Sequence, residues 1–382
     1  MLPKTTRLPS VDFIRGVVMV LMAIDHVRVY AGVPAGGPDP AVFFTRWVTH
    51  FCVPVFVFFA GTGAFFNERK LNNKRALSKY LFTRGIILVL LELTVIRFGW
   101  MFNFNYAEFT LAGVIWMLGW CMVIMAALVR LSAGTVGIIG LLIAFGQQVF
   151  GLIDKILPAS VQTPAGWVWG FIYPSGLQGA PGVAVLYVLV PWIGVMAAGY
   201  GFGIVLLKEP AMRRKWCYII GLSATALFLI IGSIIALKQP SQPNADGPAF
   251  LFRLLNQQKY PASQLYLLMT LGPAIALLPL AEKARGWLAN VMLTFGRVPM
   301  FYYLLHIPLI HVAALIVNLI REGSAHQEWY TTAPFASVPS EHRWSLPLLY
   351  LVFVIVVTLL YFLCRWYVAV KARNPAKWLS YI

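Results

Sequence analysis

The chain has 382 residues, of which 60% are hydrophobic and 11% are charged, and its mean hydropathy is +0.76. This composition excludes a water-soluble globular domain and predicts a protein that crosses a lipid bilayer repeatedly. The net charge of +17 comes from Lys and Arg residues that are dispersed among apolar stretches, so the charge argues against a nucleic-acid-binding protein.

Apolar stretches of roughly 20 residues, long enough to cross the hydrocarbon core, recur along the chain. We predict an all-α polytopic integral membrane protein with about ten spans in a single domain over residues 1–382. The predicted spans lie at residues 11–31, 43–66, 80–98, 109–130, 134–153, 182–207, 215–237, 263–281, 296–319 and 345–368.

Lys and Arg residues gather on one side of this arrangement. Short loops that are rich in these residues stay in the cytoplasm. Both termini are therefore predicted to be cytoplasmic. The basic clusters that support this orientation are Lys4 with Arg7, residues 69–84, 208–215, 283–297 and 365–377.

The apolar run that begins at Ser10 and ends at His26 contains four ionisable residues: Asp12, Arg15, Asp25 and His26. A charge at membrane depth costs roughly 2.5 to 3.5 kcal/mol and therefore faces a bundle interior or a water-filled cavity. Arg15 and His26 lie on nearly the same helix face, roughly 16 Å apart along the axis. This face is predicted to carry a site, and the alternative for Arg15 is an ion pair with Asp12.

Further charges lie within or beside the apolar spans. Asp25 points about 100° away from His26, so Arg28 and Arg97 are its candidate partners. Glu92, inside the third predicted span, either pairs with one of these cations or belongs to the site.

Four histidines lie in or beside predicted spans: His26, His50, His306 and His311. The ten-span arrangement predicts that they surround one cavity. Imidazole titrates near neutral pH and is the usual general base. His306 could instead bond to a neighbouring helix, and His50 could simply anchor the start of its span. The candidate catalytic residues are His26, His50 and His306, and the candidate substrate-binding residues are Asp12, Arg15, Asp25, Arg46, Glu92, Arg97 and His311.

Three predicted outer segments, at residues 154–181, 238–262 and 320–344, are rich in Pro, aromatic and hydrogen-bonding residues. Aromatic rings beside carboxylates, such as Trp329 near Glu328, suit a sugar. The alternative is the aromatic belt of any membrane protein, to which Trp167 and Trp169 would then belong. The four cysteines show no paired spacing, so neither a disulfide framework nor a metal site is predicted.

Several motifs carry a resemblance to a known family. Residues 10–16 (SVDFIRG), 51–61 (FCVPVFVFFAG), 190–194 (VPWIG) and 301–306 (FYYLLH) resemble bacterial membrane proteins related to the catalytic domain of heparan-α-glucosaminide N-acetyltransferase. The resemblance runs from the first predicted span to the ninth. The spacing Arg15-x10-His26 also resembles the first-span motif of the acyltransferase 3 family.

The resemblance implies acyl transfer across a bacterial inner membrane. Acetyl-CoA or another acyl-CoA would be the cytosolic co-substrate, no metal would take part, and a carbohydrate or glycolipid would be the acceptor on the far side. Arg15 would lie near the CoA phosphates, and His26 would act as general base or acyl carrier. The lysosomal enzymes place the reactive His in the loop after the first span, whereas residues 31–44 contain no His here, so His50 is a rival to His26.

Two other classes compete with an acyltransferase. A proton-coupled secondary transporter or permease also places ionisable residues inside its helices, although no two-fold internal repeat is apparent here. A non-catalytic membrane subunit is the third class. The identity of the acceptor, the acyl chain and association into a homo-oligomer stay open at this point.

Overall fold

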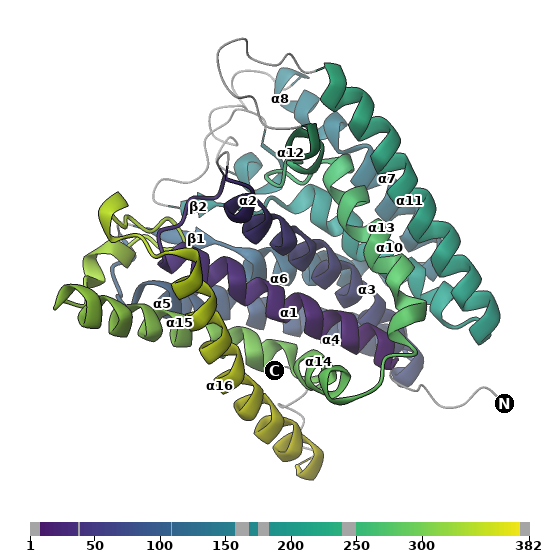
Figure 1. Ribbon diagram of the computed structural model, residues 1–382. Coiled ribbons are helices and arrows are strands. Elements are labelled where there is room, and N and C mark those ends of the chain that lie inside the picture. Colours follow the sequence, from purple (N-terminus) through teal and green to yellow (C-terminus); the bar gives the residue numbers. More distant parts are fainter. Residues whose placement is uncertain are drawn as a thin grey trace. The chain divides into compact units, whose positions relative to one another are not determined.

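A computed structural model describes residues 8–36, 39–107, 109–156, 168–174, 183–238 and 250–374. Lys4, Arg7, Trp167 and Lys377, on which the predictions of topology and of an aromatic outer segment drew, lie outside the described residues. The chain forms two compact units, whose elements are labelled in Figure 1.

Unit 1 comprises Val53–Leu93 and Tyr106–Pro279, with Met1–Arg7 assigned to it as well. Its described elements are α3 (Cys52–Leu71), α4 (Lys74–Leu91), β1 (Thr110–Ala112), α6 (Val114–Leu128), α7 (Ala133–Phe145), η3 (Gln147–Leu152), α8 (Ile153–Ile156), β2 (Val183–Val185), α10 (Leu189–Leu206), α11 (Pro210–Lys238), α12 (Phe250–Leu255) and α13 (Gln264–Ala281). The two short strands pair in parallel, with Thr110 opposite Val183.

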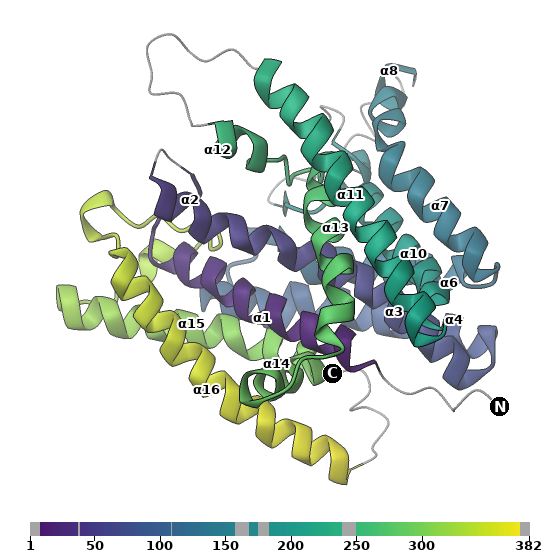
Figure 2. The same ribbon diagram turned by 45° about the vertical axis from the view of Figure 1, so that its right-hand side comes forward.

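Glycines bring the helices of unit 1 close together. Helix α4 packs on α6, and α7 packs on α10, as can be followed in Figure 2. A Cβ at Gly85 would lie 2.6 Å from the carbonyl oxygen of Gly119, and the same distance separates a Cβ at Gly140 from the carbonyl oxygen of Gly194. Membrane helices associate through such small residues, because the backbones can then approach closely.

Unit 2 comprises Leu8–Cys52, Thr94–Asn105 and Leu280–Ile382. Its described elements are α1 (Pro9–Tyr30), α2 (Pro40–Trp47), η1 (Val48–Phe51), α5 (Arg97–Met101), α14 (Trp287–Arg297), α15 (Pro299–Glu322), η4 (Gln327–Tyr330), η5 (Ser340–His342) and α16 (Leu346–Arg373). The chain enters it from α4 through a π-helical turn, Glu92–Ile96.

Helix α1 is the centre of unit 2 and packs against α14, α15 and α16 (Figure 1). Its crossing with α14 is reciprocal. A Cβ at Gly16 would overlap the carbonyl oxygen of Met292, and a Cβ at Gly296 would overlap that of Asp12. Only glycine fits at these two positions, because each contact is with a backbone atom.

The sequence also explains where several helices begin and end. The side chains of Asp39, Asn73 and Ser132 accept hydrogen bonds from backbone N–H groups in the first turns of α2, α4 and α7. Pro9 opens α1, where its missing N–H costs nothing. Gly323 ends α15 with a φ of +74°, which glycine adopts without strain.

The described helices confirm a helical membrane protein. Each predicted span contains a helix, and six helical segments are long and apolar enough to cross a bilayer. One of these, Pro40–Leu71, joins α2, η1 and α3. Helix α6 is shorter than its predicted span because β1 takes the first residues of that span. Helix α1 is continuous and long enough, but its charged side chains make it less apolar than the six segments. The number of crossings and the cytoplasmic termini stay predictions.

Candidate active site

Two histidines from distant parts of the chain meet inside unit 2. Nδ1 of His26, on α1, lies 2.7 Å from Nε2 of His306, on α15. The two rings stack with centroids 4.8 Å apart and planes at 23°. His306 is fully buried, whereas His26 is only partly buried. We therefore call His306 the inner histidine of the pair and His26 the outer histidine.

The surroundings of His306 assign the protons in the neutral pair. Nδ1 of His306 lies 2.7 Å from the carbonyl oxygen of Tyr303 and 3.2 Å from that of Tyr302. Carbonyl oxygens only accept, so Nδ1 carries the hydrogen and Nε2 of His306 is an acceptor. His26 must then donate from Nδ1, which leaves the basic lone pair on its Nε2. This assignment is inferred from the hydrogen-bond network.

Helix α5 also contacts His26, through the side chain of Trp100. The ring of Trp100 meets His26 edge-on, with centroids 4.8 Å apart. Trp100 also stacks on Tyr30 at 5.8 Å, and the Tyr30 hydroxyl donates to the Trp100 carbonyl oxygen at 2.6 Å. Sequence reasoning missed both aromatic residues. Tyr30 lies one helical turn after His26, and this spacing was the available signal.

His311 lies further along α15 in an aromatic surrounding. Its ring stacks on Phe102 at 3.9 Å and lies 4.9 Å from Tyr30. Nε2 of His311 is 3.0 Å from Oε1 of Gln327, and its Nδ1 is 3.3 Å from the carbonyl oxygen of Gly99. His311 is thus held among side chains from α1, α5 and the segment after α15.

A hydroxyl closes this network on the outer side. Tyr330 donates to the backbone oxygen of Tyr30 at 3.2 Å and accepts from Asn318 at 2.9 Å. Burial raises the pKa of Tyr330 to about 12. Its hydroxyl therefore stays protonated at neutral pH and remains a donor.

The predicted charged residues of α1 form ion pairs within their own helix. Asp25 lies 3.0 Å from both Nε and Nη2 of Arg28, and Arg28 also donates to the Val33 carbonyl oxygen. Asp12 lies 3.9 Å from Arg15. Of the two candidate partners for Asp25, the structure selects Arg28.

Arg97 and Glu92 each fix a local piece of backbone. Arg97 is buried and donates to the carbonyl oxygens of Asn103 and Asn105 at 2.7 and 2.6 Å. Glu92 belongs to unit 1, where one carboxylate oxygen accepts from the N–H groups of Ile115 and Trp116 at 2.9 and 3.2 Å. These two N–H groups are in the first turn of α6, so Glu92 caps that helix.

The remaining candidates, His50 and Arg46, lie at the junction of α2 and η1. Nδ1 of the buried His50 lies 3.2 and 3.1 Å from the carbonyl oxygens of Arg46 and Trp47. The Arg46 side chain is partly buried. These two contacts hold the His50 ring against its own turn of the chain, whereas Nδ1 of His26 contacts a histidine on another helix.

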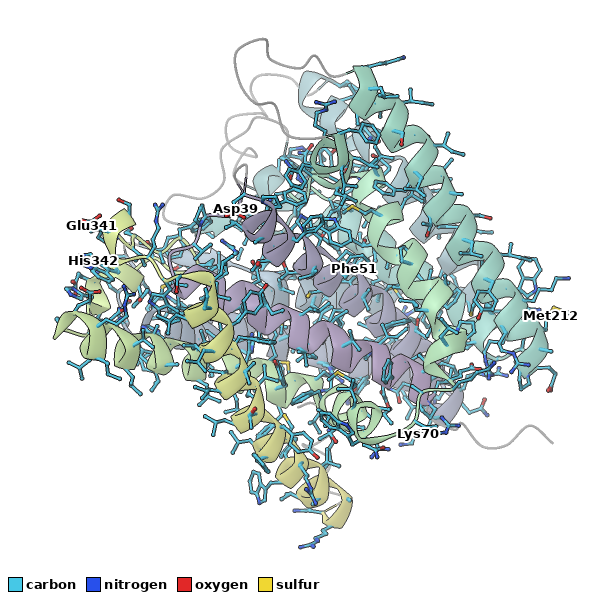
Figure 3. All side chains as sticks on the ribbon, viewed as in Figure 1. Asp39, Phe51, Lys70, Met212, Glu341 and His342 are labelled. Atoms are coloured by element: carbon cyan, nitrogen blue, oxygen red, sulfur yellow. The ribbon has the colours of Figure 1, made fainter. Side chains whose placement is uncertain are left out.

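The segment between α15 and α16 carries a second group of titratable rings. His326 stacks on Trp329 at 4.0 Å and lies 2.8 Å from Glu328, while His342 lies 2.9 Å from Glu322. His342, in η5, therefore lies beside Glu322, the last residue of α15 (Figure 3). The contact with His326 lowers the pKa of Glu328. Aromatic faces and carboxylates thus lie together in this segment.

Over the described residues, no group of three or more His, Cys, Asp or Glu side chains is placed to hold a metal ion. The four cysteines are described, and each is buried and forms no disulfide bond.

The family model for the catalytic region of heparan-alpha-glucosaminide N-acetyltransferase matches residues 7–254. The chain belongs to this family. A search of curated proteins found no match to the chain.

Membership of the heparan-alpha-glucosaminide N-acetyltransferase family makes the chain a membrane protein of a transferase family. The match confirms the resemblance that the sequence motifs indicated. His26 and His50 lie inside the matched residues, whereas His306 lies outside them. The family match alone therefore does not identify the partner of His26.

Proposed function

We propose that unit 2 carries the catalytic site of a membrane acetyltransferase, which moves an acyl group from an acyl-CoA to a sugar-type acceptor. In this proposal His26 is the general base or acyl carrier, and His306 orients it. The observation that carries the proposal is the 2.7 Å contact between Nδ1 of His26 and Nε2 of His306. Family membership supplies the type of reaction.

The histidine pair resembles the arrangement by which enzymes activate a general base. A base acts well when a second group fixes its tautomer and ring orientation. Here the Tyr303 carbonyl oxygen fixes His306, and His306 fixes His26. The partly buried His26 is the member that a substrate can approach.

The reaction needs one proton to be moved and returned. Nε2 of His26 accepts the proton of an acceptor hydroxyl or amine as the acceptor attacks the thioester carbonyl carbon. The C–S bond then breaks, and the leaving CoA thiolate takes the proton from His26. In the acyl-carrier variant, Nε2 attacks the thioester carbonyl carbon, the C–S bond breaks and CoA leaves as the thiolate. The acceptor then attacks the acyl carbon, the bond to Nε2 breaks, and the acceptor proton goes to the CoA thiolate.

Arg15 is the residue that we assign to the CoA phosphates. It lies on the same continuous helix as His26, roughly 16 Å away along the axis. Its side chain is 18% exposed, and its 3.9 Å pair with Asp12 is long. A guanidinium suits phosphate oxygens because it offers several donors in one plane.

We place the acceptor near the segment after α15. Trp329 and Glu322 supply the aromatic face and the carboxylate that a carbohydrate or glycolipid headgroup would use. The donor would approach from the cytoplasm and the acceptor from the far side of a bacterial inner membrane. The family match does not favour the transporter alternative.

The test is release of free CoA thiol from acetyl-CoA by detergent-purified protein, with and without amino and hydroxy sugars. We expect acceptor-dependent release by the wild type and its loss in His26→Ala. Release that survives in His26→Ala would move the reaction to another residue, with His50→Ala as the next variant. No release with any acyl-CoA or acceptor would contradict the proposed activity.

A further inference from the structure

Helix α5 is only five residues long, and its last carbonyl groups have no partners within the helix. Side chains from other elements of unit 2 face these oxygens instead. The Tyr30 hydroxyl donates to Trp100 at 2.6 Å, and Nε2 of Gln327 donates to Met101 at 2.7 Å. His311 faces Gly99 at 3.3 Å. Helix α5 thus ends in a cap built by α1, α15 and η4.

Gln327 is the residue that ties this cap together. Its amide nitrogen donates to Met101, so its amide oxygen must be the atom that faces Nε2 of His311 at 3.0 Å. The orientation of the amide is therefore assigned by its two partners. A neutral His311 donates to one oxygen at a time, either that of Gln327 or that of Gly99.

The cap is on the same residues of α5 that include Trp100, whose ring contacts the candidate base His26. Trp100, between the two capped residues Gly99 and Met101, is buried and meets His26 edge-on. Pro308 of α15 supports the other side, because a Cβ at Gly99 would lie only 3.3 Å from it. The position of the Trp100 ring is thus set by the backbone that Gln327 holds.

We propose that Gln327 is a positioning residue for acyl transfer, acting through Met101 and Trp100 on the ring of His26. The inference rests on the proposed function of His26. Gln327 begins η4, two residues before Trp329, so it joins the segment assigned to the acceptor to the helix that contacts the base. A misplacement of about 1 Å at a reacting group can cost 10²-fold in rate.

Two substitutions separate the bonds of Gln327. Gln327→Ala removes both. Gln327→Glu keeps an acceptor for His311 but cannot donate to Met101. Thr332→Val is the matched control, because it removes a different bond of the same segment, the one from Thr332 to the Phe335 carbonyl oxygen at 2.8 Å.

We expect both Gln327 variants to lose about tenfold or more in kcat for acyl transfer. Their KM for acetyl-CoA should stay within about twofold, and their melting temperature should match that of Thr332→Val. An unchanged kcat in Gln327→Ala would overturn the inference. A parallel loss of kcat and melting temperature would also overturn it, because the role would then be structural.

A second measurement does not depend on activity. Modification of His26 by diethyl pyrocarbonate, followed by mass spectrometry, should change in rate by at least threefold in Gln327→Ala and remain at the wild-type rate in Thr332→Val. An unchanged rate would contradict the positioning role. If the wild type transfers no acyl group, the proposed function fails, while this measurement still tests whether Gln327 restrains His26.

Discussion

At the scale of single residues, the two ionisable groups that meet in unit 2 differ in what they can reach. His306 is fixed by backbone oxygens and fully buried, whereas His26 is partly buried and is held through His306. An imidazole that is fixed on one nitrogen and basic on the other is prepared for proton transfer without reorganisation. In the proposed reaction, His306 therefore acts by fixing the tautomer of His26.

Replacing the inner histidine should slow the reaction more than it weakens binding. His306→Phe keeps a ring at this position but gives His26 no acceptor, so we expect kcat to fall about 10²-fold with little change in KM for acyl-CoA. Steady-state kinetics of the purified variant checks this. His306→Gln, whose amide oxygen can accept, should recover part of the rate, and full activity in His306→Phe would contradict the assignment.

Glu92 is a buried acidic residue whose carboxylate accepts hydrogen bonds from the start of α6. Glu92→Ala should destabilise the protein by about 1–2 kcal/mol, because two N–H groups of α6 lose their acceptor. Glu92→Gln should lose less, since an amide oxygen still accepts. Thermal unfolding in detergent measures both. A fall in activity at unchanged stability would instead make Glu92 a member of the site.

At the scale of the elements, glycines decide how closely the helices approach. The nearest atom to an added Cβ is a backbone atom of the facing helix at each of six glycines: Gly16, Gly85, Gly119, Gly140, Gly194 and Gly296. A backbone atom cannot move aside as a flexible side chain can. These crossings are therefore the positions at which an added methyl group is least tolerated.

Gly16→Ala should lower the melting temperature and the yield of folded protein, because its Cβ would overlap the Met292 carbonyl oxygen. Gly134→Ala is the control, since nothing lies within 4 Å of a Cβ there. In that helix alanine should be neutral or stabilise by up to about 1 kcal/mol. Equal melting temperatures for the two variants would contradict the role of the crossing.

At the scale of the whole molecule, the predicted topology can be tested by chemistry at the two membrane faces. Glu341→Cys should react with a membrane-impermeant maleimide in intact cells, whereas Lys70→Cys and Met212→Cys (Figure 3) should react only after permeabilisation. The four natural cysteines are buried, so background labelling should be low. Labelling of Lys70→Cys in intact cells would contradict cytoplasmic placement.

Composition and periodicity predicted the helices because burial in lipid demands long apolar runs. The first predicted span, at residues 11–31, corresponds to α1 at Pro9–Tyr30. Local charge pairs were also predictable, and Asp25 with Arg28 is one of the alternatives that the helix geometry offered.

The pairing of His26 with His306 could be expected only as a shared cavity, because 280 residues separate the two. The sequence does not say which rings touch. The turn after α4 was hidden for a different reason. Residues 80–98 resemble one continuous span, yet the chain forms a π-helical turn at Glu92–Ile96 and then α5. Trp100 and Met101, the latter bonded by Gln327, lie in the short helix that follows this turn, and no periodic pattern signals the turn.

The glycine contacts between α1 and α14 also act on a side chain that neither glycine touches. A helix behaves as a stiff rod over a few turns, so sliding it by one residue shifts every side chain by about 1.5 Å and turns it by about 100°. The reciprocal backbone contacts at Gly16 and Gly296 fix both the axial position and the rotation of α1 relative to α14. Because His26 lies on α1, its position and orientation are fixed by the same contacts. The absence of a side chain at Gly16 and Gly296 thereby determines the direction in which the imidazole of His26 points, almost three helical turns from Gly16.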